Sequence, residues 1–145
     1  METLTAVQAH ARIERDAETK ANAEIRDVRK TLTPGRAVRQ GDVYLVRCKD
    51  SAKPRGDVIA SGQLVDGTTQ GSRHVAAAPA KVHADPVADG HLPDCIHADA
   101  LLGPSIVATD EFVVTHPEHA HVRCPAGVYQ VVHQLDAATR QRVQD

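Results

Sequence analysis

Histidines are the side chains whose spacing first suggests chemistry in this sequence. The segment His-Pro-Glu-His-Ala-His at 116–121 supplies His116, His119 and His121. Side chains two apart on a strand point to one face, so His119 and His121 could present both imidazoles to a metal ion. His74 or His133 would be the third ligand. A chain with nine histidines in 145 residues also brings some of them together by chance. We therefore expect these histidines to be solvated or hydrogen-bonded and to bind no metal.

A second segment strengthens the metal alternative. Pro125-Ala126-Gly127-Val128-Tyr129 resembles the second sequence motif of cupins and, with the histidines of 116–121, implies a cupin-like metal-binding protein or enzyme. The first cupin motif places a Glu a few residues after its His pair, but residues 122–124 are Val, Arg and Cys. The His of the second motif is replaced by Gln130. Two of four expected ligands are therefore missing, and we expect no metal or other cofactor.

Other catalytic patterns are incomplete. No serine stands in a G-x-S-x-G elbow, and no cysteine carries a family signature. The three glycines between Gly62 and Gly71 lack the Lys and Ser/Thr of a phosphate-binding loop. Asp110 and Glu111 are adjacent, so on a strand they point to opposite faces and cannot flank a substrate. We therefore expect no catalytic residues and a protein that is not an enzyme.

Composition narrows the class of partner. Acidic and basic residues are balanced, with a formal net charge of −2, and they form no like-charged block. The chain has three aromatic residues, too few for the stacking surfaces that bind single-stranded nucleic acid. Three widely spaced cysteines indicate neither a disulfide framework nor a zinc ribbon. We expect a cytoplasmic protein that binds neither nucleic acid nor membrane, with a thin core rich in Ala and Val.

Residues 1–33 differ from the rest of the chain. Gly and Pro are absent before Pro34, and apolar residues recur at helical spacing, among them Ile25, Val28 and Leu32. Pro34-Gly35 would end such a helix at or just before Thr33. The sequence therefore predicts an N-terminal helical arm over 1–33, which either folds back or reaches a neighbouring subunit, followed by a second domain over 34–145.

Beyond Pro34 the periodicity changes from 3.6 to 2, which predicts a mostly β domain of the sandwich or jellyroll kind. Turn signals at intervals of about ten residues separate the expected strands. The strands are expected at 41–48, 57–65, 72–76, 105–109, 111–115, 119–124 and 127–135.

One long loop is expected over 76–97, because this stretch is rich in Ala, Pro and His and has no sustained period. The Val-rich runs at 111–115 and 128–132 carry no Lys, so we expect them to be exposed edge strands that invite another chain.

The combination of a polar N-terminal helix, short strands and a thin core resembles a capsid cement, or decoration, protein of a tailed bacteriophage, of the small jellyroll type. The phrases RQGDVYLVRC (39–48) and VVTHPEHAHVRCPAGVYQVVHQ (113–134) are similar to segments of small phage-encoded proteins. The resemblance implies a structural protein of the virion, assembled in the bacterial host cytoplasm. It also implies a homodimer that clamps the major capsid protein or a similar shell subunit.

Overall fold

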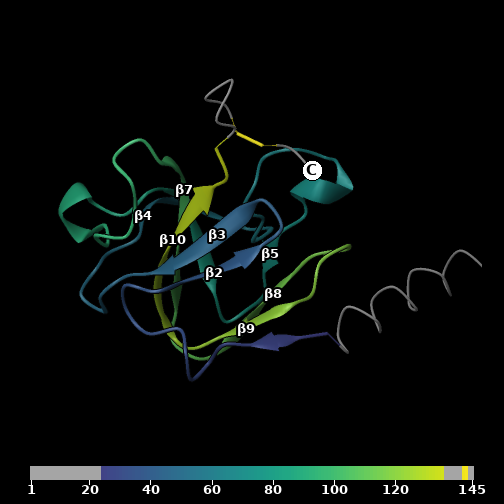
Figure 1. The fold of residues 1–145 in the computed structure, drawn as a ribbon, viewed down its shortest axis with the longest axis horizontal. Helices are drawn as coiled ribbons and strands as arrows, with labels where there is room; N and C mark the ends of the chain where they lie inside the picture. Colours follow the sequence, from purple (N-terminus) through teal and green to yellow (C-terminus); the bar gives the residue numbers. More distant parts are fainter. Residues whose placement is uncertain (1–23, 136–141, 144–145) are drawn as a thin grey trace, which may run out of the picture.

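Two β-sheets form the framework of the described part of the molecule (Figure 1). The computed structural model describes residues 24–135 and 142–143. The six-stranded sheet contains, in spatial order, β2 (Ala37–Gln40), β3 (Val43–Arg47), β10 (Gly127–His133), β7 (Leu101–Ala108), β6 (Lys81–Asp85) and β4 (Arg55–Ile59). The four-stranded sheet contains β1 (Arg26–Asp27), β9 (Val122–Cys124), β8 (Phe112–Thr115) and β5 (Val75–Ala76). Two short 3-10 turns are η1 (Gln70–Ser72) and η2 (Asp89–His91).

The main core lies between the two sheets. Val43, Leu45 and Ile106 come from the six-stranded sheet and have no exposed surface, as do Val114 and Val122 from the other sheet. In β8 and β9 the buried residues alternate with partly buried ones, while β3 and β7 also contain consecutive buried residues. Such β-branched and aliphatic residues suit a pleated surface that packs on a core. Within the described residues, no helix has the length and apolar character needed to cross a membrane.

The β2–β3 hairpin places the polar groups that matter below. Gln40 pairs with Val43 across a two-residue turn, Gly41-Asp42. Gly41 has φ of +58°, a conformation that glycine adopts without steric cost. The burial alternation of β2 turns Val38 and Gln40 toward the core. The hairpin therefore brings one amide and one carboxyl group to the end of the core.

The strand-rich part of the sequence prediction is confirmed. The runs at 41–48, 111–115 and 127–135 contain β3, β8 and β10, and the run at 105–109 overlaps the second half of the longer β7. The structure adds β2 and β6, which the sequence reading missed. It also begins β9 at Val122, so His119 and His121 lie in the loop before the strand and not on it.

The predicted helix is wrong for its last ten residues, while residues 1–23 lie outside the described part of the chain. Residues 24–33 contain β1, which runs parallel to β9, followed by turns. Val28 and Leu32 have helical spacing because a turn, closed by the Leu32 N–H donating to the Val28 carbonyl oxygen, directs them both to the core. Leu32 is 3% exposed.

The long loop expected over 76–97 is also wrong, since β5 ends at Ala76 and β6 spans Lys81–Asp85. Only Val82 of β6 is fully buried, so its sequence carries little alternation. The chain after β6 covers the outer face of the six-stranded sheet. There Val87 and Leu92 pack with Cys48, Ala52 and Val128 in a second, smaller apolar cluster.

The edge strands differ from those expected. β8 lies between β9 and β5, and β10 lies between β3 and β7, so both runs expected at edges are interior. The edges of the six-stranded sheet are β2 and β4 instead. Interior strands need no protective Lys, which explains why the Val-rich runs carry none.

Two truncations test the correction at the N-terminus. Deletion of 1–33 removes Leu32 from the core and β1 from β9, so we expect a loss of about 3–5 kcal/mol in unfolding free energy. Deletion of 1–23 keeps both and serves as the matched control. Urea unfolding followed by circular dichroism measures the difference, and equal midpoints for the two variants would contradict this assignment.

Candidate functional site

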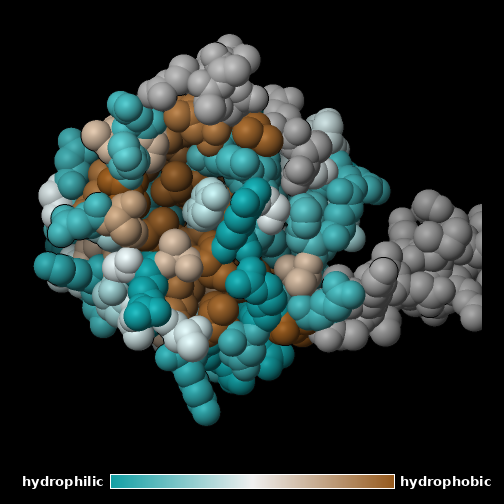
Figure 2. Space-filling view, viewed as in Figure 1, coloured by the Kyte–Doolittle hydropathy of each residue, from teal (hydrophilic) through white to brown (hydrophobic). Residues whose placement is uncertain are grey.

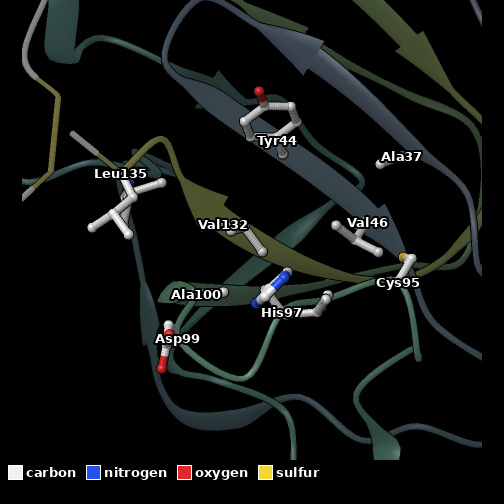
Figure 3. A pocket seen from close by; sticks show the side chains of 11 residues that line it. Ala37, Tyr44, Val46, Cys95, His97, Asp99, Ala100, Val132 and Leu135 are labelled. Atoms are coloured by element: carbon white, nitrogen blue, oxygen red, sulfur yellow. The ribbon is translucent and has the colours of Figure 1, made fainter. Parts of the chain in front are cut away.

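An apolar pocket opens on the outer face of the six-stranded sheet, where a hollow floored by apolar side chains is visible (Figure 2). Its volume is about 310 Å³, and Tyr44, Val46 and Val132 of β3 and β10 form one wall (Figure 3). The segment 95–100 forms the opposite wall, with Cys95 and His97. Such a pocket offers apolar contact and few polar groups, which suits binding better than chemistry.

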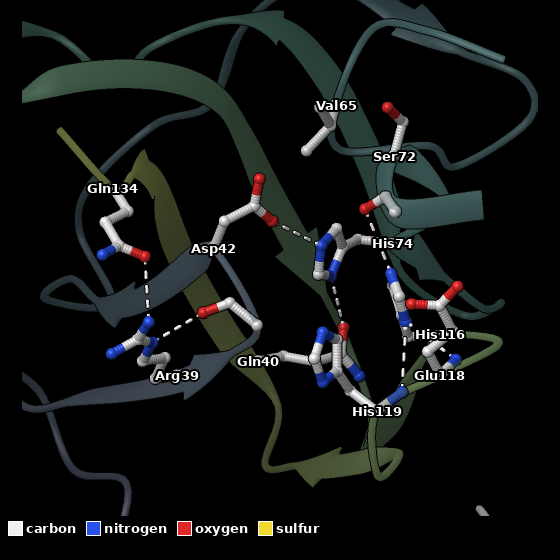
Figure 4. Close-up of polar contacts among 12 residues, drawn as sticks. Arg39, Gln40, Asp42, Val65, Ser72, His74, His116, Glu118, His119 and Gln134 are labelled. Atoms are coloured by element: carbon white, nitrogen blue, oxygen red, sulfur yellow. Dashed lines mark hydrogen bonds and ion pairs between the residues drawn. The ribbon is translucent and has the colours of Figure 1, made fainter. Parts of the chain in front are cut away.

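A second candidate site is a cluster of buried polar side chains at the end of the core (Figure 4). His74 precedes β5, and His116 and His119 belong to the loop between β8 and β9. The ring centroids of His74 and His116 are 4.3 Å apart, and those of His116 and His119 are 4.6 Å apart. His74 is fully buried and His116 is 2% exposed. We refer to His74, His116, His119, Gln40 and Asp42 as the histidine cluster.

The amide of Gln40 has one possible orientation. Its Nε2 donates to the carbonyl oxygens of Val114 and Ala120, both at 3.0 Å. The reversed amide would set an oxygen against two carbonyl oxygens, which is repulsive. The Oε1 atom must therefore accept, and it lies 2.7 Å from Nδ1 of His74. His74 consequently carries a proton on Nδ1.

The other ring nitrogen of His74, Nε2, lies 3.0 Å from Oδ1 of Asp42. Burial lowers the pKa of His74, and the neighbouring His116 ring lowers it further, while the contact with Asp42 acts in the opposite direction. Both ring nitrogens thus have partners inside the protein.

His116 is held as a neutral ring. Its Nε2 lies 3.1 Å from the Gly71 carbonyl oxygen, which can only accept, so Nε2 carries the proton. Its Nδ1 accepts the backbone N–H groups of Glu118 and His119, at 3.0 and 3.2 Å. These bonds shape the tight turn after β8 and leave neither nitrogen directed at a ligand.

The geometry does not favour the metal alternative. Across residues 24–135 and 142–143, no three His, Cys, Asp or Glu side chains are arranged to hold a metal ion. Of the three histidines of 116–121, His116 and His119 pack beside His74 with tilted rings. His121 is buried too, and its carbonyl oxygen accepts the Arg26 N–H at 2.9 Å. His133 lines a separate cavity of about 500 Å³ with Arg142.

Comparison with known families places the chain. Residues 39–134 match the model of a family described as a domain of unknown function, DUF8820. The chain belongs to the DUF8820 family. No curated protein and no solved structure matches it. The matched segment begins one residue before Gln40 and contains the whole histidine cluster.

Sequence reasoning missed Gln40 and Asp42 as members of the cluster. One signal could have found Gln40: it follows Val38 at a spacing of two, on the face that a strand would turn inward. A polar residue at an inward position needs hydrogen-bond partners elsewhere in the core. The pairing with His74, 34 residues away, leaves no local pattern in this DUF8820 chain.

A charge substitution tests the orientation of Gln40. In Gln40→Glu the side chain offers only acceptors to the carbonyl oxygens of Val114 and Ala120, so both lose a donor. We expect a loss of about 2–6 kcal/mol in unfolding free energy at pH 7. Gln134→Glu is the matched control, because Gln134 Oε1 only accepts from Arg39 Nη2. Urea unfolding of both variants decides, and equal stability of the two would refute the orientation.

Proposed function

We propose that the protein is a structural protein that binds and stabilises an assembled protein shell, and that it is a capsid cement protein of a tailed bacteriophage. In this proposal the two sheets are a sandwich of the jellyroll kind, the molecule acts as a homodimer, and the partner is the major capsid protein or a similar shell subunit. The virion capsid is its location, and no catalysis is involved.

The observation that carries the proposal is the contrast between the two candidate sites. The histidine cluster has the residue types of a catalytic or metal site, but the ring nitrogens of His74 and His116 are bonded to other parts of the same fold. The apolar pocket, in contrast, faces outward on a sheet. A molecule whose reactive side chains hold its own fold, and whose open surface is apolar, is better suited to binding than to chemistry.

The position of the pocket supports attachment through the six-stranded sheet. Ala37 lines the pocket and belongs to β2, an edge strand of this sheet. A docked partner can therefore fill the pocket with an apolar side chain while its backbone approaches the strand edge. The second edge strand, β4, has a register irregularity between Arg55 and Val58, which disfavours strand addition there.

Binding to shells tests the proposal. The chain is mixed with empty, undecorated capsids of tailed phages, the shells are pelleted, and the bound protein is measured. We expect saturable binding by the wild type and at least tenfold weaker binding by Ala37→Glu, since a charge at the pocket wall must be desolvated on docking. Failure of the wild type to bind any assembled shell would contradict the proposed function.

A matched variant separates the pocket from general surface effects. Val58→Glu adds the same charge to β4, at the opposite edge of the same sheet, where Val58 is 54% exposed. We expect its binding to stay within twofold of the wild type. Loss of binding in Val58→Glu with normal binding in Ala37→Glu would move the contact to β4 and exclude the pocket.

A further inference from the structure

The contact between His74 and Asp42 requires a proton. A neutral imidazole and an ionised carboxylate, the usual states of these side chains at neutral pH, would not supply one. The orientation of Gln40 fixes one proton on Nδ1 of His74, so a neutral ring would direct the bare lone pair of Nε2 at Asp42. An ionised carboxylate has only lone pairs as well. Two unprotonated acceptors 3.0 Å apart in a buried site repel each other and satisfy neither group.

We propose that His74 and Asp42 form a single buried proton-binding site, which holds one proton between Nε2 and Oδ1 throughout the neutral pH range. The pair has a net charge of zero whether the proton lies on nitrogen or on oxygen, because imidazolium with carboxylate and imidazole with carboxylic acid contain the same number of protons. A buried site favours a pair with no net charge.

The charged and titratable side chains around His74 and Asp42 are compatible with a shared proton. The ring of His116 packs against that of His74 at a tilt of 43°, and it is held neutral by the two N–H groups from which its Nδ1 accepts. His119 lies behind it, with its ring centroid 6.5 Å from that of His74. Arg39, on β2, turns away and donates to the Gly41 carbonyl oxygen and to Gln134. Glu118, in the same loop as His116, has an exposed side chain.

On the β10 side the facing group is His133. Burial lowers its pKa, Arg142 lowers it further, and Asp42 and Asp66 oppose this. A neutral His133 supplies no cation to stabilise a carboxylate at Asp42. In the described chain, the ion-pair partner of Asp42 is therefore His74, and the proton stays with the pair.

Holding this proton changes how stability depends on pH. In the unfolded chain, Asp and His titrate near their ordinary pKa values of about 3.9 and about 6.5. Between these values the unfolded pair also holds one proton, so folding leaves the proton count unchanged. Above about pH 6.5 the unfolded pair holds none and the folded pair holds one. Burial lowers the pKa of His74 because it disfavours a lone charged ring. The proposed proton belongs instead to the pair, which has no net charge, so the pair holds it more tightly than the separated groups do. The pair's contribution to stability is therefore fully present below about pH 6.5 and is lost as pH rises above it.

Asp42→Asn in the full-length chain tests the proposal. The new amide can donate to Nε2 of a neutral His74, so the folded variant needs no shared proton. At each pH the number of protons taken up on folding is then greater by one for the wild type than for the variant. We expect the ratio of the wild-type unfolding constant to that of the variant to rise about tenfold per pH unit from pH 5 to 8.

The opposite result is equally clear. If Asp42 is a carboxylate beside a neutral His74, both proteins gain one proton on unfolding below about pH 6.5 and none above it. The ratio would then be independent of pH, and the proposal would be overturned. Asp57→Asn, at an exposed position on β4, is the matched control, and its ratio to the wild type should stay constant within twofold over this range.

A measurement on the wild type keeps the proposal testable if Asp42→Asn does not fold. With ¹⁵N-labelled histidine, the shared proton should give a low-field proton resonance linked to Nε2 of His74 and still present at pH 8. An Nε2 resonance typical of a bare nitrogen, with no such proton, would overturn the proposal. Neither result depends on shell binding, so failure here is distinguishable from failure of the proposed function.

Discussion

The amide of Gln40 is the contact on which the polar end of the molecule depends. It sits on β2 of one sheet and donates to the carbonyl oxygen of Val114 in the other sheet. Because its two N–H groups are both used, its oxygen must accept from His74, which fixes the protonation of that ring. The protonation of that ring in turn constrains the protonation of Asp42. The orientation of one amide therefore determines hydrogen bonds that connect the two sheets.

The polar end and the aliphatic core have different roles in the free energy of folding. Burial of Val, Leu and Ile between the sheets gives roughly 1.5–3 kcal/mol per side chain and is non-directional. The histidine cluster contributes less net stabilisation, because its groups lose water on burial. It is directional, however, since each donor must meet its acceptor. The core therefore drives collapse, and the cluster selects one arrangement of the loops after β8 and before β5.

Local pattern was sufficient for the strands that are rich in β-branched and aromatic residues. β3 and β8 were predictable because Val, Leu, Tyr and Phe are concentrated in them and turns bound them. β6 was missed since its neighbours in space, β4 and β7, and not its own sequence, make it a strand. The helix failed at 24–33 for a related reason. A spacing of four between Val28 and Leu32 suits a tight turn over a sheet edge as well as a helix.

The candidate site was predictable only as an inventory of residue types. The close spacing of the histidines in 116–121 indicates a candidate site, but the partners that determine their role lie far away in sequence. Gln40 and His74 are 34 residues apart, and His116 meets the carbonyl of Gly71 over 45 residues. Metal ligation and internal hydrogen bonding use the same imidazole nitrogens, so the sequence could not distinguish them. Only the direction of each ring does.

The buried cluster also bears on the exposed edge of the sheet. Among the described strands β2 pairs with β3 alone, and the register of this four-residue edge strand depends on the inward direction of Val38 and Gln40. A slip by one residue would turn Ala37 and Arg39 inward and expose Gln40, which would break its bonds to Val114, Ala120 and His74. The cluster thus holds β2 in register from its inner face, while Ala37 lines the apolar pocket on the outer face. A rigid edge loses less conformational entropy when a partner docks, so internal polar bonds that touch no partner still favour binding.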